Sequence, residues 1–107
     1  NGLNFIDSEV QNLKNLGCKF KIPHTGWNGI NKKKHNKLLN DISDLSDFYF
    51  NHSFVFVPKN KDIILSTTIH DIEFASVVNY DNIFGMQFHP EKSGEVGKKL
   101  LKNFLEL

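Results

Sequence analysis

An aromatic alternation over residues 48–57 (FYFNHSFVFV) sets the strictest condition on how this chain folds. Phenylalanine occupies four of the five even-numbered positions and His52 occupies the fifth. Side chains alternate between the two faces of a strand, so one face of this segment would be almost wholly aromatic. Such a face has to be covered, and the sequence therefore predicts a strand inside a packed sheet.

The segments that follow have the pattern of further strands and then of one helix. Residues 63–69, 73–80 and 83–88 are rich in β-branched and aromatic side chains, which predicts three strands. Residues 93–105 carry an apolar stripe at helical spacing, formed by Val96, Leu100, Leu101 and Phe104. Several strands and a terminal helix indicate α/β or α+β packing.

The first half of the chain is less regular. Residues 3–10 and 18–22 have the composition of short strands, and residues 23–29 (PHTGWNG) contain enough chain-breaking residues to predict an ordered loop. Residues 37–45 predict a short helix, because apolar side chains recur in them at helical spacing.

The composition excludes several classes of function. With 107 residues the chain forms one small domain at most. Its net charge of +1, with lysine as the only strongly basic residue, predicts no nucleic-acid partner. No apolar run is long enough for a membrane helix, and no spacing of His or Cys is typical of a metal site. A single cysteine excludes an internal disulfide and fits a cytoplasmic location.

His89 and Glu91 are the candidate chemical pair. They stand two residues apart at the end of a predicted strand, so they can share a face with Cα atoms about 6.6 Å apart. A carboxylate at that spacing can orient an imidazole, which supplies two members of a nucleophile–base–orienter triad. The spacing alone leaves a structural explanation open, because a glutamate near a helix N-terminus is favourable in itself.

Three short motifs carry a resemblance to a known family. Residues 85–93 (GMQFHPEKS) resemble the C-terminal signature of class I (triad-type) glutamine amidotransferases. Residues 23–28 (PHTGWN) and 49–54 (YFNHSF) resemble motifs of one subfamily, the glutaminase subunits of imidazole glycerol phosphate synthase from histidine biosynthesis. The resemblance implies that residues 1–107 form the C-terminal half of an α/β amidotransferase domain, with a mixed sheet and a terminal helix.

The resemblance also implies an activity without a cofactor. His89 matches the general base that deprotonates a catalytic cysteine, and Glu91 matches the acid that orients this base. The cysteine attacks the side-chain amide of glutamine, ammonia leaves, and water releases glutamate from the thioester. In the family, the ammonia then passes to a barrel-shaped cyclase subunit without entering solvent.

Further site residues follow from the same motifs. Ser53 and Phe54 match positions whose backbone holds the α-carboxylate of glutamine. Trp27 and Asn28 match a loop that faces the cyclase, and Lys92 matches a lysine that forms a salt bridge across this interface. His52 projects with the phenylalanines, which predicts a structural histidine and not a catalytic one.

The sequence departs from the family in its nucleophile. The family's cysteine sits in a Gly-x-Cys-x-Gly turn that leads into a helix, upstream of the three motifs. Cys18 is the only thiol, and it is followed by Phe20 where the turn needs a small residue and by Pro23 where a helix would begin. We therefore expect the nucleophile outside these residues, and we expect the isolated 107-residue chain to be inactive.

Two alternatives remain open from the sequence. The chain could be a catalytically inactive fragment that serves as an interaction module. It could also belong to paralogous subunits that supply ammonia for surface-sugar biosynthesis. A departure at His70 and Asp71, where the family usually has an aromatic residue and a glycine, predicts a local difference in that turn.

Overall fold

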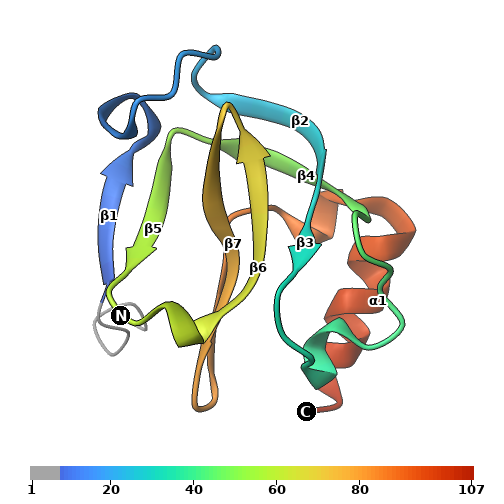
Figure 1. The fold of residues 1–107 in the computed structure, drawn as a ribbon. Coiled ribbons are helices and arrows are strands. Elements are labelled where there is room, and N and C mark those ends of the chain that lie inside the picture. Colours follow the sequence, from blue (N-terminus) through green and yellow to red (C-terminus); the bar gives the residue numbers. More distant parts are fainter. Residues whose placement is uncertain (1–7) are drawn as a thin grey trace.

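A computed structural model describes residues 8–107, which form three small antiparallel sheets and one terminal α-helix (Figure 1). The elements are β1 (Ser8–Asn12), β2 (His24–Gly29), β3 (Asn31–Lys32), β4 (Asp47–His52), β5 (Phe54–Pro58), β6 (Ile64–His70), β7 (Ile72–Tyr80), β8 (Ile83–Met86) and α1 (Gly94–Leu105). Short 3-10 turns lie at Leu13–Leu16, Lys37–Leu39, Lys61–Ile63 and Pro90–Lys92. The predicted strand over residues 3–10 falls mostly outside the described residues, and β1 begins within it.

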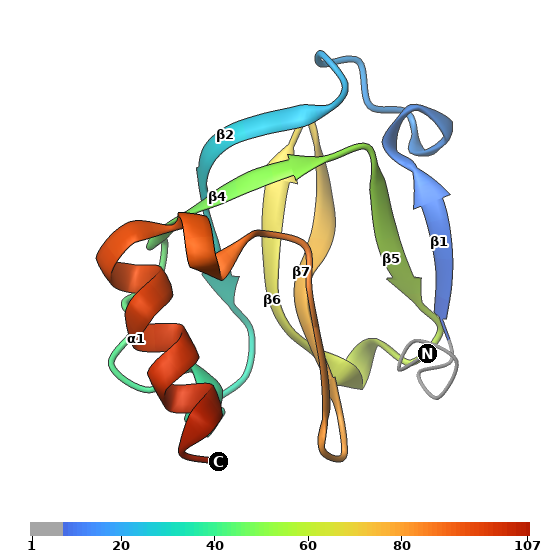
Figure 2. The same cartoon turned by 180° about the vertical axis from the view of Figure 1, so that it is seen from behind.

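The sheets pair strands that are both near and far in sequence. The largest has the order β3-β6-β7-β8, while β1 pairs with β5 and β2 pairs with β4. An isolated bridge between Phe50 and Phe88 joins β4 to the segment after β8. From behind, α1 flanks the side of the molecule at which β2 ends and β4 begins (Figure 2). The three late strands and the terminal helix predicted from the sequence are confirmed.

The aromatic alternation does not form one continuous strand. Phe48 and Phe50 are fully buried in β4, but at the start of β5 the buried side chain is Val55, and Phe54 is 54% exposed. Ser53 separates the two strands, so the inward-facing positions change from even to odd numbers. A shift of one residue moves every later side chain to the opposite face. The prediction of a single strand was therefore wrong in a way that turns Phe54 outward.

The residues predicted as a loop form a strand instead. Residues 24–29 pair along their whole length with β4, from His24 opposite His52 to Gly29 opposite Asp47. The breakers in this segment are accommodated because Gly26 adopts a positive φ of 126°. Residues 18–22, predicted as a strand, form none.

The predicted helix over residues 37–45 is limited to the single 3-10 turn Lys37–Leu39. Asp41 and Leu45 have φ of 61° and 65°, which are left-handed conformations that cannot continue a right-handed helix. Leu38 and Ile42 are nevertheless buried, whereas Leu45 is 63% exposed. The apolar spacing thus reflects the burial of Leu38 and Ile42 in an irregular segment, and not a helix.

A stacked aromatic cluster and the terminal helix hold this end of the molecule together. The rings of Phe48 and Phe88 stack with centroids 4.2 Å apart, and Leu100 of α1 is fully buried against the core. Asn103 donates from its Nδ2 to the carbonyls of Leu38 and Asn40, at 2.9 and 2.8 Å. The helix is therefore fixed to the segment before β4. No helix in the described part of the chain is long and apolar enough to span a membrane.

Of the departures at residues 70 and 71, His70 ends β6 and Asp71 connects β6 to β7. Asp71 adopts a φ of 67°, the left-handed conformation for which glycine is usually used. Its Oδ2 accepts a hydrogen bond from the backbone N of Lys19, at 2.6 Å. The side chain thereby compensates for a backbone conformation that favours glycine.

Candidate active site

The chain leaves β8 and presents His89 at the start of the turn Pro90–Lys92. The backbone N of His89 donates to the Tyr49 carbonyl at 2.8 Å, and the preceding Phe88 bridges Phe50. Two contacts to β4 thus fix the backbone on which the imidazole stands. The side chain of His89 is 39% exposed, so it is held at a surface and remains accessible.

His89 and Glu91 form the predicted pair. His89 Nδ1 lies 3.1 Å from Glu91 Oε2. An ionised carboxylate only accepts hydrogen bonds, so Nδ1 carries the proton and the Nε2 of a neutral ring keeps its lone pair. The backbone N–H of Glu91 itself and the hydrogen bond from His89 hold the pKa of the Glu91 carboxyl below its usual value. The arrangement suits a base that accepts a proton at Nε2.

Ser93 supports this pair, although the sequence assigned it no role. Its Oγ donates to the His89 carbonyl at 2.6 Å and accepts from the Tyr49 backbone N at 2.9 Å. The side chain is 1% exposed. A buried hydroxyl therefore ties the histidine turn to β4. A polar residue within the motif, just before the helix, was the available signal.

Gln87 fixes the segment that contains Ser53 and Phe54. Its Nε2 donates to the Phe54 carbonyl at 3.1 Å, and its Oε1 accepts from the Phe56 backbone N at 2.9 Å. The carboxamide thus continues the hydrogen bonding of the sheet beyond β8. Because Gln87 lies two residues before His89, it places the Ser53–Phe54 segment close to the imidazole.

The register of β1 and β5 shows which way the Phe54 peptide groups point. The backbone N of Leu13, the residue after β1, donates to the Ser53 carbonyl at 2.9 Å. The Ser53 carbonyl therefore faces the side of β1. Hydrogen-bonded pairs alternate with open ones in antiparallel strands, so the N–H and the C=O of Phe54 both face away from β1. Its carbonyl is bound by Gln87 on that side. An N–H on the same side is suitably placed to bind a carboxylate.

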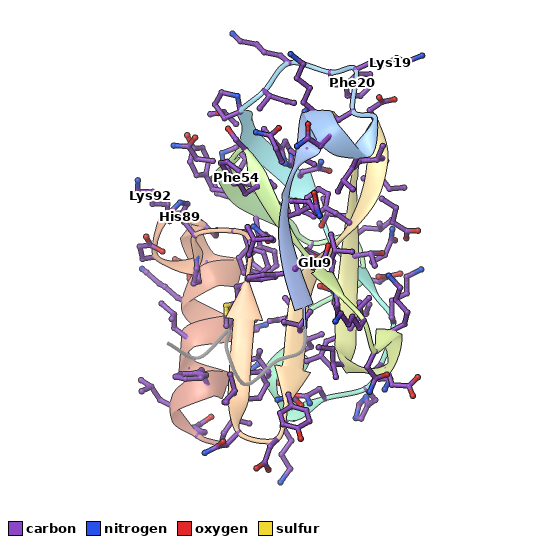
Figure 3. All side chains as sticks on the ribbon, turned by 90° about the vertical axis from the view of Figure 1, so that its left-hand side faces the viewer. Glu9, Lys19, Phe20, Phe54, His89 and Lys92 are labelled. Carbon is purple, nitrogen blue, oxygen red and sulfur yellow. The ribbon has the colours of Figure 1, made fainter. Side chains whose placement is uncertain are left out.

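Figure 3 shows the labelled side chains of Phe54, His89 and Lys92 close to one another in projection, on one side of the molecule. The contact between Gln87 and Phe54 makes this proximity a property of the structure and not of the view. The structure therefore brings the predicted glutamine-binding and catalytic positions together.

The residues predicted to face a partner differ in their environments. Trp27 is 56% exposed, with its ring 6.0 Å from that of Tyr49, and Lys92 is exposed. The amide of Asn28 points inward: its Nδ2 donates to the Ile69 carbonyl at 2.8 Å, and its Oδ1 accepts from the backbone N of Gly29 at 2.8 Å. Trp27 and Lys92 thus have free surface, whereas the Asn28 side chain is engaged within the chain.

A second group of histidines lies behind this surface. His24 Nδ1 is 2.9 Å from His52 Nε2, and the ring of His70 stacks on that of His24 with centroids 4.1 Å apart. Burial, followed by the nearby His70 and His52, lowers the pKa of His24 to about 4. Burial is also the main cause that lowers the pKa of His52. Among the described residues, no three His, Cys, Asp or Glu side chains are placed to hold a metal ion.

Cys18 is placed away from the candidate site. It is 7% exposed, and its Sγ lies 3.3 Å from the His70 carbonyl. Lys19, which follows it, is labelled at the upper right of Figure 3, whereas His89 is labelled on the left. Its burial and its contact with a backbone carbonyl argue against Cys18 as the nucleophile.

Comparisons with known proteins agree with these features. A family model described as class I glutamine amidotransferase matches residues 5–107. The imidazole glycerol phosphate synthase subunit HisH of Pelagibacter ubique is 44% identical over 106 residues, which are 99% of this chain and 51% of that protein. A protein with this name from Methanococcus maripaludis is 47% identical over 98% of this chain and 52% of its own length. The Pyrococcus furiosus protein is 46% identical over 99% and 53%. The chain thus spans about half the length of these curated relatives.

Proposed function

Because the chain belongs to the class I glutamine amidotransferase family, we propose that it forms the C-terminal half of a glutaminase subunit of imidazole glycerol phosphate synthase. The family confirms the α/β fold class expected from the sequence. The complete subunit would hydrolyse glutamine to glutamate and ammonia. It would pass the ammonia to a cyclase partner in a heterodimer.

The hydrogen bond between His89 and Glu91 is the observation that carries this proposal. With Nδ1–H bound to the carboxylate, Nε2 is free to take the proton of a cysteine thiol. The resulting thiolate adds to the amide carbon of glutamine, and the imidazolium returns the proton to the departing ammonia. Glu91 stabilises the imidazolium formed between these two steps. Water then enters by the same base and releases glutamate from the thioester.

The substrate and the partner occupy neighbouring parts of the site in this proposal. The backbone of Ser53 and Phe54 binds the α-carboxylate of glutamine, which is supported by the direction of the Phe54 peptide groups. The exposed Trp27 and Lys92 contact the cyclase, with Asn28 holding the strand that carries Trp27. We place the cysteine outside these residues, so the 107-residue chain alone should not hydrolyse glutamine.

The similarity to three HisH proteins supports the histidine pathway over the surface-sugar alternative. The same proposal places the protein in the cytoplasm, which a chain with a single cysteine fits.

The test is a glutaminase assay on the complete gene product, with and without the cyclase encoded in the same genome. Glutamine-dependent formation of imidazole glycerol phosphate supports the proposal. Glutaminase activity that supports no synthesis with this cyclase would assign the subunit to another acceptor. Absence of glutamine hydrolysis with the partner present would contradict the proposed activity.

A further inference from the structure

We propose that His24 and His52 are positioning residues of the glutamine site. Together with Asn28 they form a one-way chain of hydrogen bonds that ends on the Phe54 carbonyl and sets the orientation of the Phe54 peptide group. This inference rests on the proposed function, because it assigns to these histidines a part in binding the α-carboxylate of glutamine.

The direction of the chain follows from its two ends. At one end the Phe54 carbonyl can only accept, so the bond of 3.0 Å from His52 requires the proton on His52 Nδ1. At the other end the Asn28 amide is oriented by Ile69 and Gly29, and its Nδ2 donates to His24 Nε2 at 3.2 Å.

The central bond completes the chain without conflict. A neutral His52 with its proton on Nδ1 accepts at Nε2, and a neutral His24 that accepts at Nε2 donates from Nδ1. The contact of 2.9 Å between His24 Nδ1 and His52 Nε2 joins one such donor to one such acceptor. Both histidines therefore adopt the same tautomer, and all four of their ring nitrogens are used.

A proton added to either ring would break the chain. If His52 were charged, its Nε2–H would face the Nδ1–H of His24. If His24 were charged, its Nε2–H would face the amide protons of Asn28. Two titratable neighbours face the pair: His70, which stacks on His24, and His89. Charge on His70 lowers the pKa of both His24 and His52, and charge on His89 lowers the pKa of His52.

The surroundings keep the rings in place. His24 is 4% exposed, and its ring stacks on that of Phe50 with centroids 4.8 Å apart. The ring of His52 lies 5.1 Å from that of Phe74. Aromatic packing of this kind leaves little freedom for a ring to flip. The two rings therefore form a rigid support between β2 and the break at Ser53.

This support acts on the group that binds the substrate in the proposed function. The Phe54 carbonyl is bound from two directions, by His52 and by Gln87. Its N–H faces the same side of the strand but lies in the preceding peptide plane, together with the Ser53 carbonyl that accepts from Leu13. The two bonds at the Phe54 carbonyl hold the following plane, so the residue that carries the N–H is fixed from both sides. Loss of the support should weaken glutamine binding, while the base at His89 stays intact.

Two substitutions at His52 separate the parts of the chain. In His52→Gln the longer amide can accept from His24 but loses the bond to Phe54. In His52→Asn the shorter amide can donate to Phe54 but loses the bond to His24. We expect KM for glutamine to rise about tenfold in His52→Gln and about threefold in His52→Asn, with kcat within about twofold of wild type. His35→Asn, in an exposed loop, is the matched control and should leave both constants unchanged.

The assay uses the complete gene product with its cyclase partner, and imidazole ¹⁵N NMR of the same protein reads the tautomers directly. Protons on Nδ1 of both His24 and His52 at neutral pH, together with the split between KM and kcat, support the inference. A proton on Nε2 of His52, or an unchanged KM in a folded His52→Gln protein, would overturn it. If wild-type protein hydrolyses no glutamine, the proposed function fails, and the NMR result still decides whether the chain exists.

Discussion

Two histidine pairs in this molecule use the same side chain for opposite purposes. In the pair of His89 and Glu91, one ring nitrogen is bound by a carboxylate, the other is open, and the ring is partly exposed. In the pair of His24 and His52, every ring nitrogen has a partner within the chain. A histidine accepts a proton without breaking a hydrogen bond only where a nitrogen is left open. The first pair is therefore suited to chemistry, and the second is suited to holding the backbone.

The charges around the two pairs strengthen the difference. An imidazolium at His89 would be stabilised by the adjacent carboxylate of Glu91. An imidazolium at His24 would be buried beside two other histidines, and its pKa is lowered to about 4 for that reason. In the proposed mechanism, protonation of His89 is a catalytic step, whereas protonation of His24 or His52 would break their hydrogen bonds.

The comparison is tested most strongly by His89→Ala in the complete gene product. Loss of the general base should lower glutamine-dependent synthesis by about 10²- to 10⁴-fold. Synthesis from added ammonia should continue, because the cyclase does not use this histidine. Measuring both rates on one preparation gives the answer, with His35→Ala as the control. If both activities disappear, His89 is a structural residue.

Glu91→Gln should have the next largest effect. The amide cannot stabilise an imidazolium, so kcat should fall by about 10²-fold with KM little changed. Because Glu91 is 58% exposed, the free energy of unfolding should stay close to that of wild type. Glu95→Gln, at an exposed carboxylate in the first turn of α1, is the matched control. A normal kcat in Glu91→Gln would show that the carboxylate does not orient the base.

Ser93→Ala tests the support beneath the catalytic pair. Removing the hydroxyl leaves the buried Tyr49 N–H without an acceptor, which should lower the free energy of unfolding by about 1–3 kcal/mol. The turn that carries His89 is also released, so we expect kcat to fall about tenfold. Chemical denaturation and steady-state kinetics measure the two effects. Unchanged kinetics in a destabilised protein would show that Ser93 supports only the fold.

The smallest expected effect is the dependence of stability on pH. The unfolded chain binds a proton at His24 near the ordinary pKa of 6.5, whereas the folded protein binds it only near 4. Lowering the pH through this range therefore favours the unfolded state, and the contribution of His24 to stability is complete above about 6.5. Denaturant unfolding between these pH values should show the decline. His24→Asn should flatten it, and the same slope in both proteins would contradict the assignment.

The same contrast explains what the sequence could predict. His89 and Glu91 are two residues apart in extended chain, so their proximity is a local property that spacing reveals. His24 and His52 meet only because β2 pairs with β4 in a particular register. Residues 24–29 contain the composition of a loop, and nothing within them indicates that they pair with a strand far along the chain. A histidine chain built on that pairing was beyond sequence reasoning.

The secondary structure was likewise predicted where the sequence pattern is local and strong, and missed elsewhere. Strands β6 and β7 and helix α1 carry strong periodic patterns, and their positions were predicted correctly. The helix expected over residues 37–45 failed because Asp41 and Leu45 adopt left-handed conformations, which apolar spacing does not reveal. At residues 70 and 71 the sequence departs from the family, yet His70 supplies a stacked ring and Asp71 adopts a backbone suited to glycine.

The break at Ser53 has a consequence for how this protein can change by insertion or deletion. Between Phe50 and Val55 the chain contains one residue more than strict alternation would allow. Deleting Ser53 would put Phe50 and Val55 on one face by simple alternation and leave Phe54 on the other. It would also remove the carbonyl that accepts from Leu13 and shift the Phe54 backbone relative to Gln87. We expect the shortened chain to keep its sheets and to lose the proposed glutamine site. The proposed glutamine site thus depends on the number of residues between β4 and β5, and not only on which side chains they carry.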